Sequence, residues 1–214
     1  GFEALVLTVD APTQGARDRE RRAGFALPPG LRMANLDGLA PRPATTGAAG
    51  QSTLFDGLMP HAATWHDVAW LQNHTRLPLL LKGVLHPADA LQAASLGVAG
   101  LIVSNHGGRT LDTTVATARA LPRIARALAA RPGLPPALLV DGGIRRGTDV
   151  LKALALGAQA VLVGRPAVQA LAANGAQGVA LALRLLRDEL EIAMALTGCH
   201  TLKDVTPDLL WSDG

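Results

Sequence analysis

The stretch that decides the fold covers residues 100–109 and reads Gly100-Leu101-Ile102-Val103-Ser104-Asn105-His106-Gly107-Gly108-Arg109. It opens with an apolar run typical of a buried strand and continues into a polar loop. In that loop an imidazole can move a proton, a guanidinium can bind a carboxylate through two hydrogen bonds, and two glycines let the backbone approach a ligand. The stretch therefore predicts a site for an anionic substrate at the end of a strand.

The same order of strand, loop and helix repeats on both sides of this stretch. The sequence predicts strands over residues 4–9, 77–81, 100–103, 137–140 and 160–163, and helices over residues 65–74, 87–96, 113–130 and 147–156, then a helix after residue 166 and a longer one over 176–196. Each strand is a continuous aliphatic run, which is typical of parallel strands buried on both faces. Polar residues follow the carboxyl ends of the strands, where (β/α) barrels have their active sites. The pattern favours an α/β barrel, with a doubly wound open sheet as the alternative.

Composition bounds the class of protein. A chain of 214 residues with 49% hydrophobic residues can hold one large domain. It has no signal-peptide pattern and no apolar run near the roughly 20 residues that span a bilayer, so we expect a soluble protein, cytoplasmic or peripheral at the membrane. The single cysteine, Cys199, excludes an internal disulfide and reads as a small residue at a helix end. The net charge of +3 comes from scattered arginines without interleaved aromatic residues, so nucleic acid is not an expected partner.

Two segments do not follow the repeat. Residues 13–22 are polar and rich in arginine, and residues 35–63 are rich in glycine, proline, alanine and threonine. A connection as long as the second one, without a periodic pattern of its own, predicts a flexible loop.

Residues that carry chemistry gather at the ends of all five predicted strands. They are Thr8, Asp10, Lys82, Ser104, His106, Arg109, Asp141, Gly142, Gly143, Arg145, Gly164 and Arg165. The last two strands end in adjacent glycine-rich turns with an arginine, a combination that predicts a phosphate site built from backbone N–H groups and guanidinium. The remaining histidines show no spacing typical of metal ligands, and the sequence predicts no metal site.

Two of these residues admit a simpler interpretation. Lys82 is one of only three lysines. It is either a fixed positive charge beside a group that becomes anionic during turnover or an ordinary lysine at a strand end. Asp10 either orients His106 and stabilises its protonated form or is a turn residue before Ala11-Pro12.

The motifs, in this order and spacing, closely resemble the FMN-dependent enzymes that oxidise 2-hydroxy acids. That family includes glycolate oxidase, lactate oxidase or dehydrogenase, mandelate dehydrogenase and the flavin domain of a flavocytochrome. The resemblance runs from residues 5–12 through the last helix and rests on residues 103–109, on Lys82-Gly83, and on the segments Asp141-Gly142-Gly143-Ile144-Arg145 and Gly164-Arg165.

The resemblance implies a (β/α)8 TIM barrel that binds FMN, in which residues 1–214 form the C-terminal part of a single domain and supply about strands four to eight. Thr8 and Ser104 would contact the isoalloxazine ring, and Lys82 would stabilise its reduced, anionic form. The ribityl chain and phosphate would be held by Asp141, Gly142, Gly143, Ile144, Arg145, Gly164 and Arg165.

The activity that the resemblance implies is oxidation of a small (S)-2-hydroxy acid, of the lactate or glycolate type, to the 2-oxo acid. Arg17 and Arg109 would bind the substrate carboxylate from two sides, and His106, paired with Asp10, would be the base. Whether His106 takes the hydroxyl proton or the α-proton stays open. So do the electron acceptor (oxygen, a quinone or a cytochrome) and the acid itself, whose side chain would meet loop positions such as Gln14 and Met33. Relatives are often tetramers, which favours a homo-oligomer.

The sequence departs from the family pattern in two ways. It shows five strands where relatives have eight, and it contains no tyrosine. We therefore expect it to be part of a longer enzyme. The alternatives are a half-barrel without catalysis that binds phosphate ligands or a partner chain, and another FMN-barrel oxidoreductase. Since five strands cannot close an eight-stranded barrel, residues 4–9 and 160–163 are predicted to be open sheet edges with little or no turnover by these residues alone.

Overall fold

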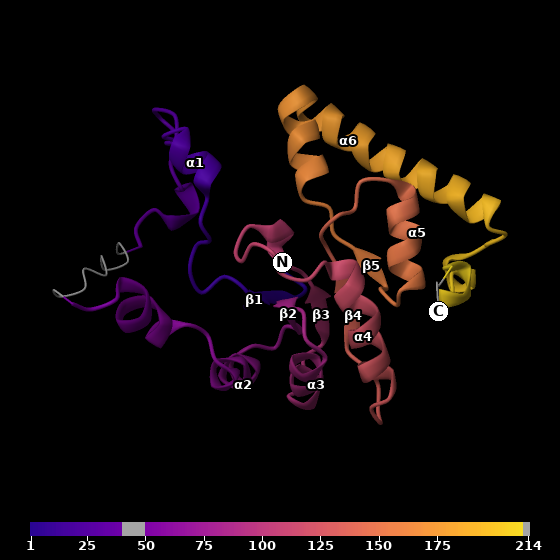
Figure 1. Ribbon diagram of the computed structural model, residues 1–214, viewed down its shortest axis with the longest axis horizontal. Coiled ribbons are helices and arrows are strands. Elements are labelled where there is room, and N and C mark those ends of the chain that lie inside the picture. Colours follow the sequence, from indigo (N-terminus) through magenta and orange to yellow (C-terminus); the bar gives the residue numbers. More distant parts are fainter. Residues whose placement is uncertain (40–49, 212–214) are drawn as a thin grey trace.

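The computed structural model describes residues 1–39 and 50–211. Its centre is a five-stranded sheet in the order β1-β2-β3-β4-β5, with every neighbouring pair parallel (Figure 1). The strands are β1 Leu5–Thr8, β2 Leu79–Val84, β3 Gly100–Val103, β4 Ala137–Val140 and β5 Ala160–Val161. Spatial order follows chain order without a reversal, as in consecutive units of a (β/α) barrel. A doubly wound sheet would reverse its strand order, so that alternative is excluded.

Helices connect the strands and cover one face of the sheet. They are α2 Trp65–His74 and α3 Pro87–Ser95, which lie below the strands in Figure 1, α4 Thr117–Ala129 and α5 Gly147–Ala155, which follow toward the right, and α6 Arg165–Leu196, which packs across α5. The short helix α1, Asp18–Arg22, lies apart from them after β1. Single helical turns occupy Ala34–Leu36, Thr53–Leu58, Met59–His61, His106–Gly108, Leu202–Asp204 and Pro207–Leu209.

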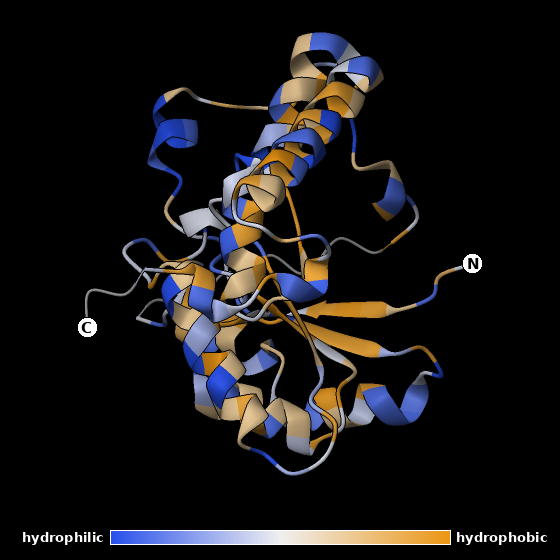
Figure 2. Ribbon diagram, turned by 90° about the vertical axis from the view of Figure 1, so that its right-hand side faces the viewer, coloured by the Kyte–Doolittle hydropathy of each residue, from blue (hydrophilic) through white to orange (hydrophobic). Residues whose placement is uncertain are grey.

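The two faces of the sheet differ in burial. The face toward the helices carries the main core, with Leu79, Leu81, Leu101 and Leu138 all buried. The residues that alternate with them point to the opposite face, where Val6 is 46% exposed although the strands are hydrophobic along their length (Figure 2). The expected burial on both faces holds for β3 but not for β1 or β4. Five strands alone leave one face of the sheet without a packing layer among the described residues.

The predicted open edges are confirmed. Within the described residues, β1 pairs only with β2 and β5 only with β4, so the sheet does not close on itself.

The carboxyl ends of two strands differ from the prediction by two residues or more. The strand predicted over residues 77–81 runs to Val84, because the left-handed Gly83 (φ +108°) absorbs a register shift and pairing with β3 resumes beyond it. Lys82 thus lies inside β2 and not after it. The strand predicted over residues 160–163 ends at Val161. Among the described residues β4 is its one neighbour, and beyond Val161 only the bond from Leu162 N–H to the Val140 carbonyl (2.9 Å) extends the pairing.

Helix boundaries also show one clear difference. The helix predicted from residue 113 begins at Thr117, because Thr113 has a φ of 60° and Ala116 is extended. The two predicted C-terminal helices are present as the two parts of α6, which breaks at Asn174 and Gly175.

Residues 40–49 of the predicted loop over residues 35–63 lie outside the described residues. The described part contains a π-helical turn, Thr53–Leu58, whose first turn is capped by the Ser52 hydroxyl accepting from Phe55 N–H (3.1 Å). The flexibility of this loop stays a prediction. No helix in the described ranges is long and apolar enough to cross a membrane.

Candidate active site

The predicted strand-end residues meet at one edge of the sheet, because the carboxyl ends of parallel strands lie together. Thr8 pairs in register with Lys82, and Val103 with Val140. A Cβ on Gly83 would lie only 2.5 Å from the Asp10 Cβ, so glycine is what lets the segment after β1 lie against β2. These contacts bring together the ends of four strands, and Arg165 after β5 joins them by its hydrogen bond to the Gly107 carbonyl.

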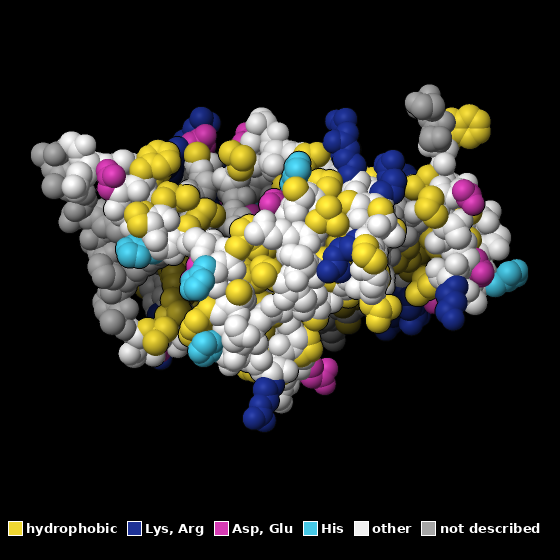
Figure 3. All heavy atoms as spheres, turned by 90° about the horizontal axis from the view of Figure 1, so that it is seen from below, with side chains coloured by type: hydrophobic (Ala, Val, Ile, Leu, Met, Phe, Trp, Pro, Cys, Tyr) yellow, Lys and Arg dark blue, Asp and Glu magenta, His cyan; other side chains and the backbone are white. Residues whose placement is uncertain are grey.

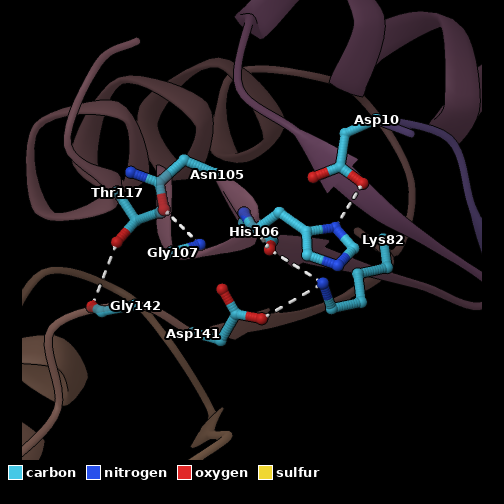
Figure 4. Close-up of polar contacts among 9 residues, drawn as sticks. Asp10, Lys82, Asn105, His106, Gly107, Thr117, Asp141 and Gly142 are labelled. Atoms are coloured by element: carbon cyan, nitrogen blue, oxygen red, sulfur yellow. Dashed lines mark hydrogen bonds and ion pairs between the residues drawn. The ribbon is translucent and has the colours of Figure 1, made fainter. Parts of the chain in front are cut away.

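His106 is paired with Asp10, as predicted. The ring Nδ1 lies 3.1 Å from the Asp10 Oδ1, and the Asp10 side chain is only 11% exposed (Figure 4). Nothing among the described residues hydrogen-bonds to the other ring nitrogen, Nε2. A carboxylate at Nδ1 favours the tautomer with the proton on that nitrogen, which leaves the Nε2 lone pair available to accept a proton.

The backbone that presents His106 is unusual. His106 has a φ of 55°, and Gly107 and Gly108 follow at 67° and 72°, so three consecutive residues are left-handed. Only glycine adopts this region without cost, and a non-glycine residue held there is most often found at a functional site. The loop adopts a costly backbone conformation, and this conformation directs the imidazole of His106 toward Asp10.

Ser104 links the loop that carries His106 to Lys82. Its fully buried hydroxyl oxygen accepts hydrogen bonds from the Lys82 Nζ (2.9 Å) and the His106 N–H (3.1 Å). With both contacts on its oxygen, the hydroxyl hydrogen of Ser104 is left to donate elsewhere. Lys82 also forms an ion pair with Asp141, Nζ to Oδ2 at 3.3 Å, with both side chains less than one-fifth exposed. These contacts hold a buried positive charge in the middle of the site (Figure 4).

Two residues without a predicted role brace the loops. The Asn105 side chain accepts from Gly107 N–H (3.0 Å) and donates to the Val115 carbonyl (3.3 Å). The buried Thr117 hydroxyl donates to the Gly142 carbonyl at 3.3 Å. An Asn two residues before a glycine is a signal for an Asx turn, so the role of Asn105 could have been predicted. No local signal points to Thr117.

The two arginines predicted to bind the substrate, Arg17 and Arg109, both contact Glu20, a residue for which no role was predicted. Arg17 Nη1 lies 3.2 Å from Glu20 Oε2, and Arg109 Nη2 lies 3.7 Å from Glu20 Oε1. The segments meet at Gly15, where a Cβ would lie 2.2 Å from the Thr110 carbonyl oxygen. Glycine at this position therefore allows the backbone before Arg17 to approach the backbone after Arg109.

The turn after β4 carries unpaired polar groups suited to FMN. Gly142 and Gly143 are left-handed, with φ of 89° and 86°. Their backbone N–H groups donate to no acceptor in the described part of the chain. The Asp141 Oδ1 is buried without a hydrogen-bond partner there. Free donors suit a phosphate and a free carboxylate oxygen suits a ribityl hydroxyl, so the residues present fit the cofactor. The Ile144 side chain packs in the core, which leaves only its backbone for this purpose.

The other predicted cofactor residues occupy the same edge. Thr8 is exposed at the end of β1 beside Lys82. The Arg145 side chain is exposed, while its N–H donates to Asp149 (2.9 Å). Arg165, which begins α6 after Gly164, donates to the Gly107 carbonyl and so ties the last turn to the histidine loop.

Residues predicted to lie outside the site do so. The other five histidines are exposed: His61, His66, His74, His86 and His200. Cys199 is a buried free thiol just after α6. Across residues 1–39 and 50–211, no three His, Cys, Asp or Glu side chains are grouped closely enough to hold a metal ion.

Fold and site together define the class of protein: part of a TIM barrel with its polar site at the carboxyl ends of the strands. The family profile of the FMN-dependent dehydrogenases matches residues 1–212, and the chain belongs to this family, whose cofactor is FMN. The predicted barrel, family and cofactor are thereby confirmed.

Individual relatives carry more specific names. The chain is 53% identical over 210 residues to an L-lactate oxidase of Roseobacter sp. (strain GAI101), covering 98% of this chain and 56% of the relative. It is 49% identical to glycolate oxidase 1 of Zea mays, covering 96% of this chain and 55% of the relative. A crystal structure of mandelate oxidase with (S)-2-phenylpropionate superposes with a TM-score of 0.80 at 44% identity, covering 96% of this chain and 54% of that one. The chain thus spans just over half the length of these relatives.

Proposed function

We propose that residues 1–214 form the C-terminal part of the FMN-binding domain of an oxidase that converts a small (S)-2-hydroxy acid of the lactate or glycolate type to its 2-oxo acid. The observation that carries this proposal is the His106–Asp10 pair, with Nε2 unpaired, at the same strand edge as two arginines that share one carboxylate. The names of the relatives, L-lactate oxidase and glycolate oxidase, support the size of the substrate.

Arg17 and Arg109 bind and orient the substrate carboxylate. Two guanidinium groups on either side of one carboxylate fix the rotation of a small acid, so its reacting carbon is presented to the base in a single orientation. The side chain of the acid then faces loop positions such as Gln14 and Met33, which we expect to set specificity.

His106 takes one proton from the substrate at Nε2. Oxidation of the alcohol releases two protons and two electrons in all, and Asp10 stabilises the imidazolium that forms when one of those protons reaches His106. Because Asp10 is buried and lies 3.1 Å from Nδ1, it also holds the ring in one orientation throughout the reaction.

FMN, when bound, would supply the two-electron oxidation and take up the hydrogen of the alcohol that His106 does not. Thr8 and the free hydroxyl hydrogen of Ser104 would contact its ring, and Lys82 would supply a positive charge where negative charge develops. The N–H groups of Gly142, Gly143 and Ile144, with Asp141, Arg145, Gly164 and Arg165, would hold the ribityl chain and the phosphate. Each of these residues acts by binding or by charge and none by a covalent bond.

We further propose oxygen as the electron acceptor, since the relatives named above are oxidases. A homo-oligomer remains the expected assembly, on family resemblance alone.

The test is anaerobic flavin reduction in the full-length protein loaded with FMN. L-Lactate, glycolate and mandelate are added separately in the absence of oxygen, and the flavin absorbance is followed. Bleaching by at least one of them, and recovery of the absorbance when air is admitted, is the expected result. Bound flavin that none of the acids reduces would contradict the proposal, and bleaching without recovery in air would contradict oxygen as the acceptor.

A further inference from the structure

Glu20 holds the place expected for a substrate carboxylate. Its two oxygens are divided between two guanidinium groups, Oε2 toward Arg17 and Oε1 toward Arg109. The proposed function requires a carboxylate between the same two side chains. The chain therefore contains its own ligand for the site that we assign to the substrate.

The position of Glu20 is specific to that residue within α1. Asp18, two residues earlier on the same short helix, pairs instead with Arg21. Arg17 also has a donor in reserve, because its Nε is buried and has no hydrogen-bond partner in the described residues. A ligand with one more acceptor atom than the Glu20 carboxylate could accept a hydrogen bond from this unpaired Arg17 Nε–H.

We propose that Glu20 is an internal competitor for the substrate carboxylate: it neutralises the two arginines in the free enzyme and is displaced when a 2-hydroxy acid binds. This inference rests on the proposed function. Two guanidinium groups held near each other repel, and Glu20 removes that repulsion while the site is empty of substrate. A 2-hydroxy acid that binds must replace the ion pairs that Glu20 forms with Arg17 and Arg109. Its affinity is therefore lower than it would be if both arginines were free.

The size of the effect follows from exposure. The Glu20 side chain is 44% exposed and that of Arg109 is 52% exposed, so their interaction is screened by water. Exposed ion pairs contribute little, and removing this one is expected to tighten acid binding by about two- to fivefold.

Glu20→Gln tests the proposal, with Asp18→Asn as the matched control. Both substitutions remove one negative charge from α1, but only the first one frees Arg17 and Arg109. The dissociation constant of pyruvate, a 2-oxo acid that oxidised flavin cannot oxidise further, is measured by calorimetry on the FMN-loaded protein, and KM and kcat are measured with L-lactate. We expect Glu20→Gln to lower both Kd and KM about two- to fivefold with little change in kcat, and Asp18→Asn to change neither.

A Kd that is unchanged or raised in Glu20→Gln, or lowered equally in Asp18→Asn, would overturn the competitor role and leave the carboxylate site in place. Arg109→Met separates this failure from a failure of the proposed function. If that variant binds pyruvate as tightly as the wild type does, the two arginines are not the carboxylate site, and the role of Glu20 falls with it.

Discussion

At the scale of single residues, each charged group of the site has few polar partners. Lys82 has two partners, Ser104 and Asp141, and both lie at the same strand edge. Asp10 contacts His106 through one oxygen, while its buried Oδ2 has no partner in the described residues. Buried polar atoms without partners are rare in stable proteins, and here Asp10, Arg17 and Asp141 each have one. Such atoms are expected where a ligand completes the hydrogen bonding.

Arg109→Met should weaken acid binding far more than it slows turnover. In the proposed site the guanidinium would contribute a charged hydrogen bond to the substrate carboxylate, so its loss is expected to raise KM by about tenfold or more. The measurement is steady-state kinetics with L-lactate, with the exposed Arg123→Met of α4 as a control for the loss of charge. An unchanged KM in Arg109→Met would remove this residue from the carboxylate site.

The gathering of the candidate site residues at one edge of the sheet was predictable from the sequence, and the exceptions have a physical reason. His106, Asp10, Lys82 and Ser104 follow or end strands, and parallel strands bring such positions together whatever the loop details. Glu20 was missed because an acidic residue in a segment rich in arginine reads as an ordinary surface ion pair. Its contact with Arg109 depends on the close approach at Gly15, which no local pattern reveals.

At the scale of elements, α2 is stabilised by its first turn. The Asp67 carboxylate accepts from the Thr64 N–H (2.7 Å) and from the Thr64 hydroxyl (2.6 Å). The hydroxyl and the N–H of Thr64 hold the pKa of Asp67 below its ordinary value of 3.8. Because the folded state lowers this pKa, the stabilisation is fully present above that value and is lost as the pH falls through the lower, folded-state pKa.

Asp67→Asn should therefore lower the melting temperature at neutral pH and have a smaller effect in acid. The neutral amide of asparagine lacks the negative charge that strengthens the two hydrogen bonds from Thr64. The N-terminal turn of α2 therefore loses its cap. Thermal unfolding of both proteins at several pH values checks this, and the gap between them should narrow below about pH 3.8. A gap that stays constant from neutral pH into that range would show that the charge of Asp67 does not matter.

The contact between α5 and α6 has no room for a side chain at Gly147. A Cβ at this position would lie 2.1 Å from the Leu190 backbone nitrogen and 2.3 Å from the Glu189 carbonyl carbon. Gly147→Ala must push the two helices apart and is expected to lower the free energy of unfolding by about 1–3 kcal/mol. Thr148→Ala, one residue later and exposed, is the control. Chemical denaturation measures both, and equal stability of Gly147→Ala and wild type would contradict the tight packing.

Element positions were easier to predict than element ends. All five strands and the helices α2, α3, α4 and α5 lie where the apolar periodicity predicts, because burial against the sheet determines them. The short polar helix α1 was not predicted. The ends of β2 and β5 depend instead on which neighbour is available for pairing and on the left-handed Gly83, and both lie outside what a periodic pattern encodes. The late start of α4 has the same origin, in the left-handed Thr113.

At the scale of the whole molecule, the sheet is open and one of its faces is partly exposed. Figure 3, which views the molecule from below, shows hydrophobic side chains gathered in several patches between charged ones. Unpaired edge strands and exposed apolar surface favour association with other chains. The side chains of Arg17, His106 and Arg109 at the proposed substrate site are 36%, 33% and 52% exposed, so water reaches them.

The 214 residues expressed by themselves are therefore expected to show little or no turnover, even if they bind FMN. Water around the site weakens the electrostatic contribution of Lys82 and the arginines, which is largest in a closed, dry site. The check is L-lactate oxidation by these residues alone beside the full-length protein at equal flavin content. Comparable rates would show that the open half-barrel is sufficient.

His106, paired with Asp10, is the base that we propose for 2-hydroxy-acid oxidation. The most direct measurement is anaerobic single-turnover reduction of the flavin by L-lactate in the full-length protein and in His106→Gln, with the exposed His74→Gln as control. We predict that His106→Gln retains FMN with an unchanged visible spectrum but reduces it at least about 10²- to 10⁴-fold more slowly, while His74→Gln behaves as wild type. Flavin reduction at the wild-type rate in His106→Gln would contradict the account.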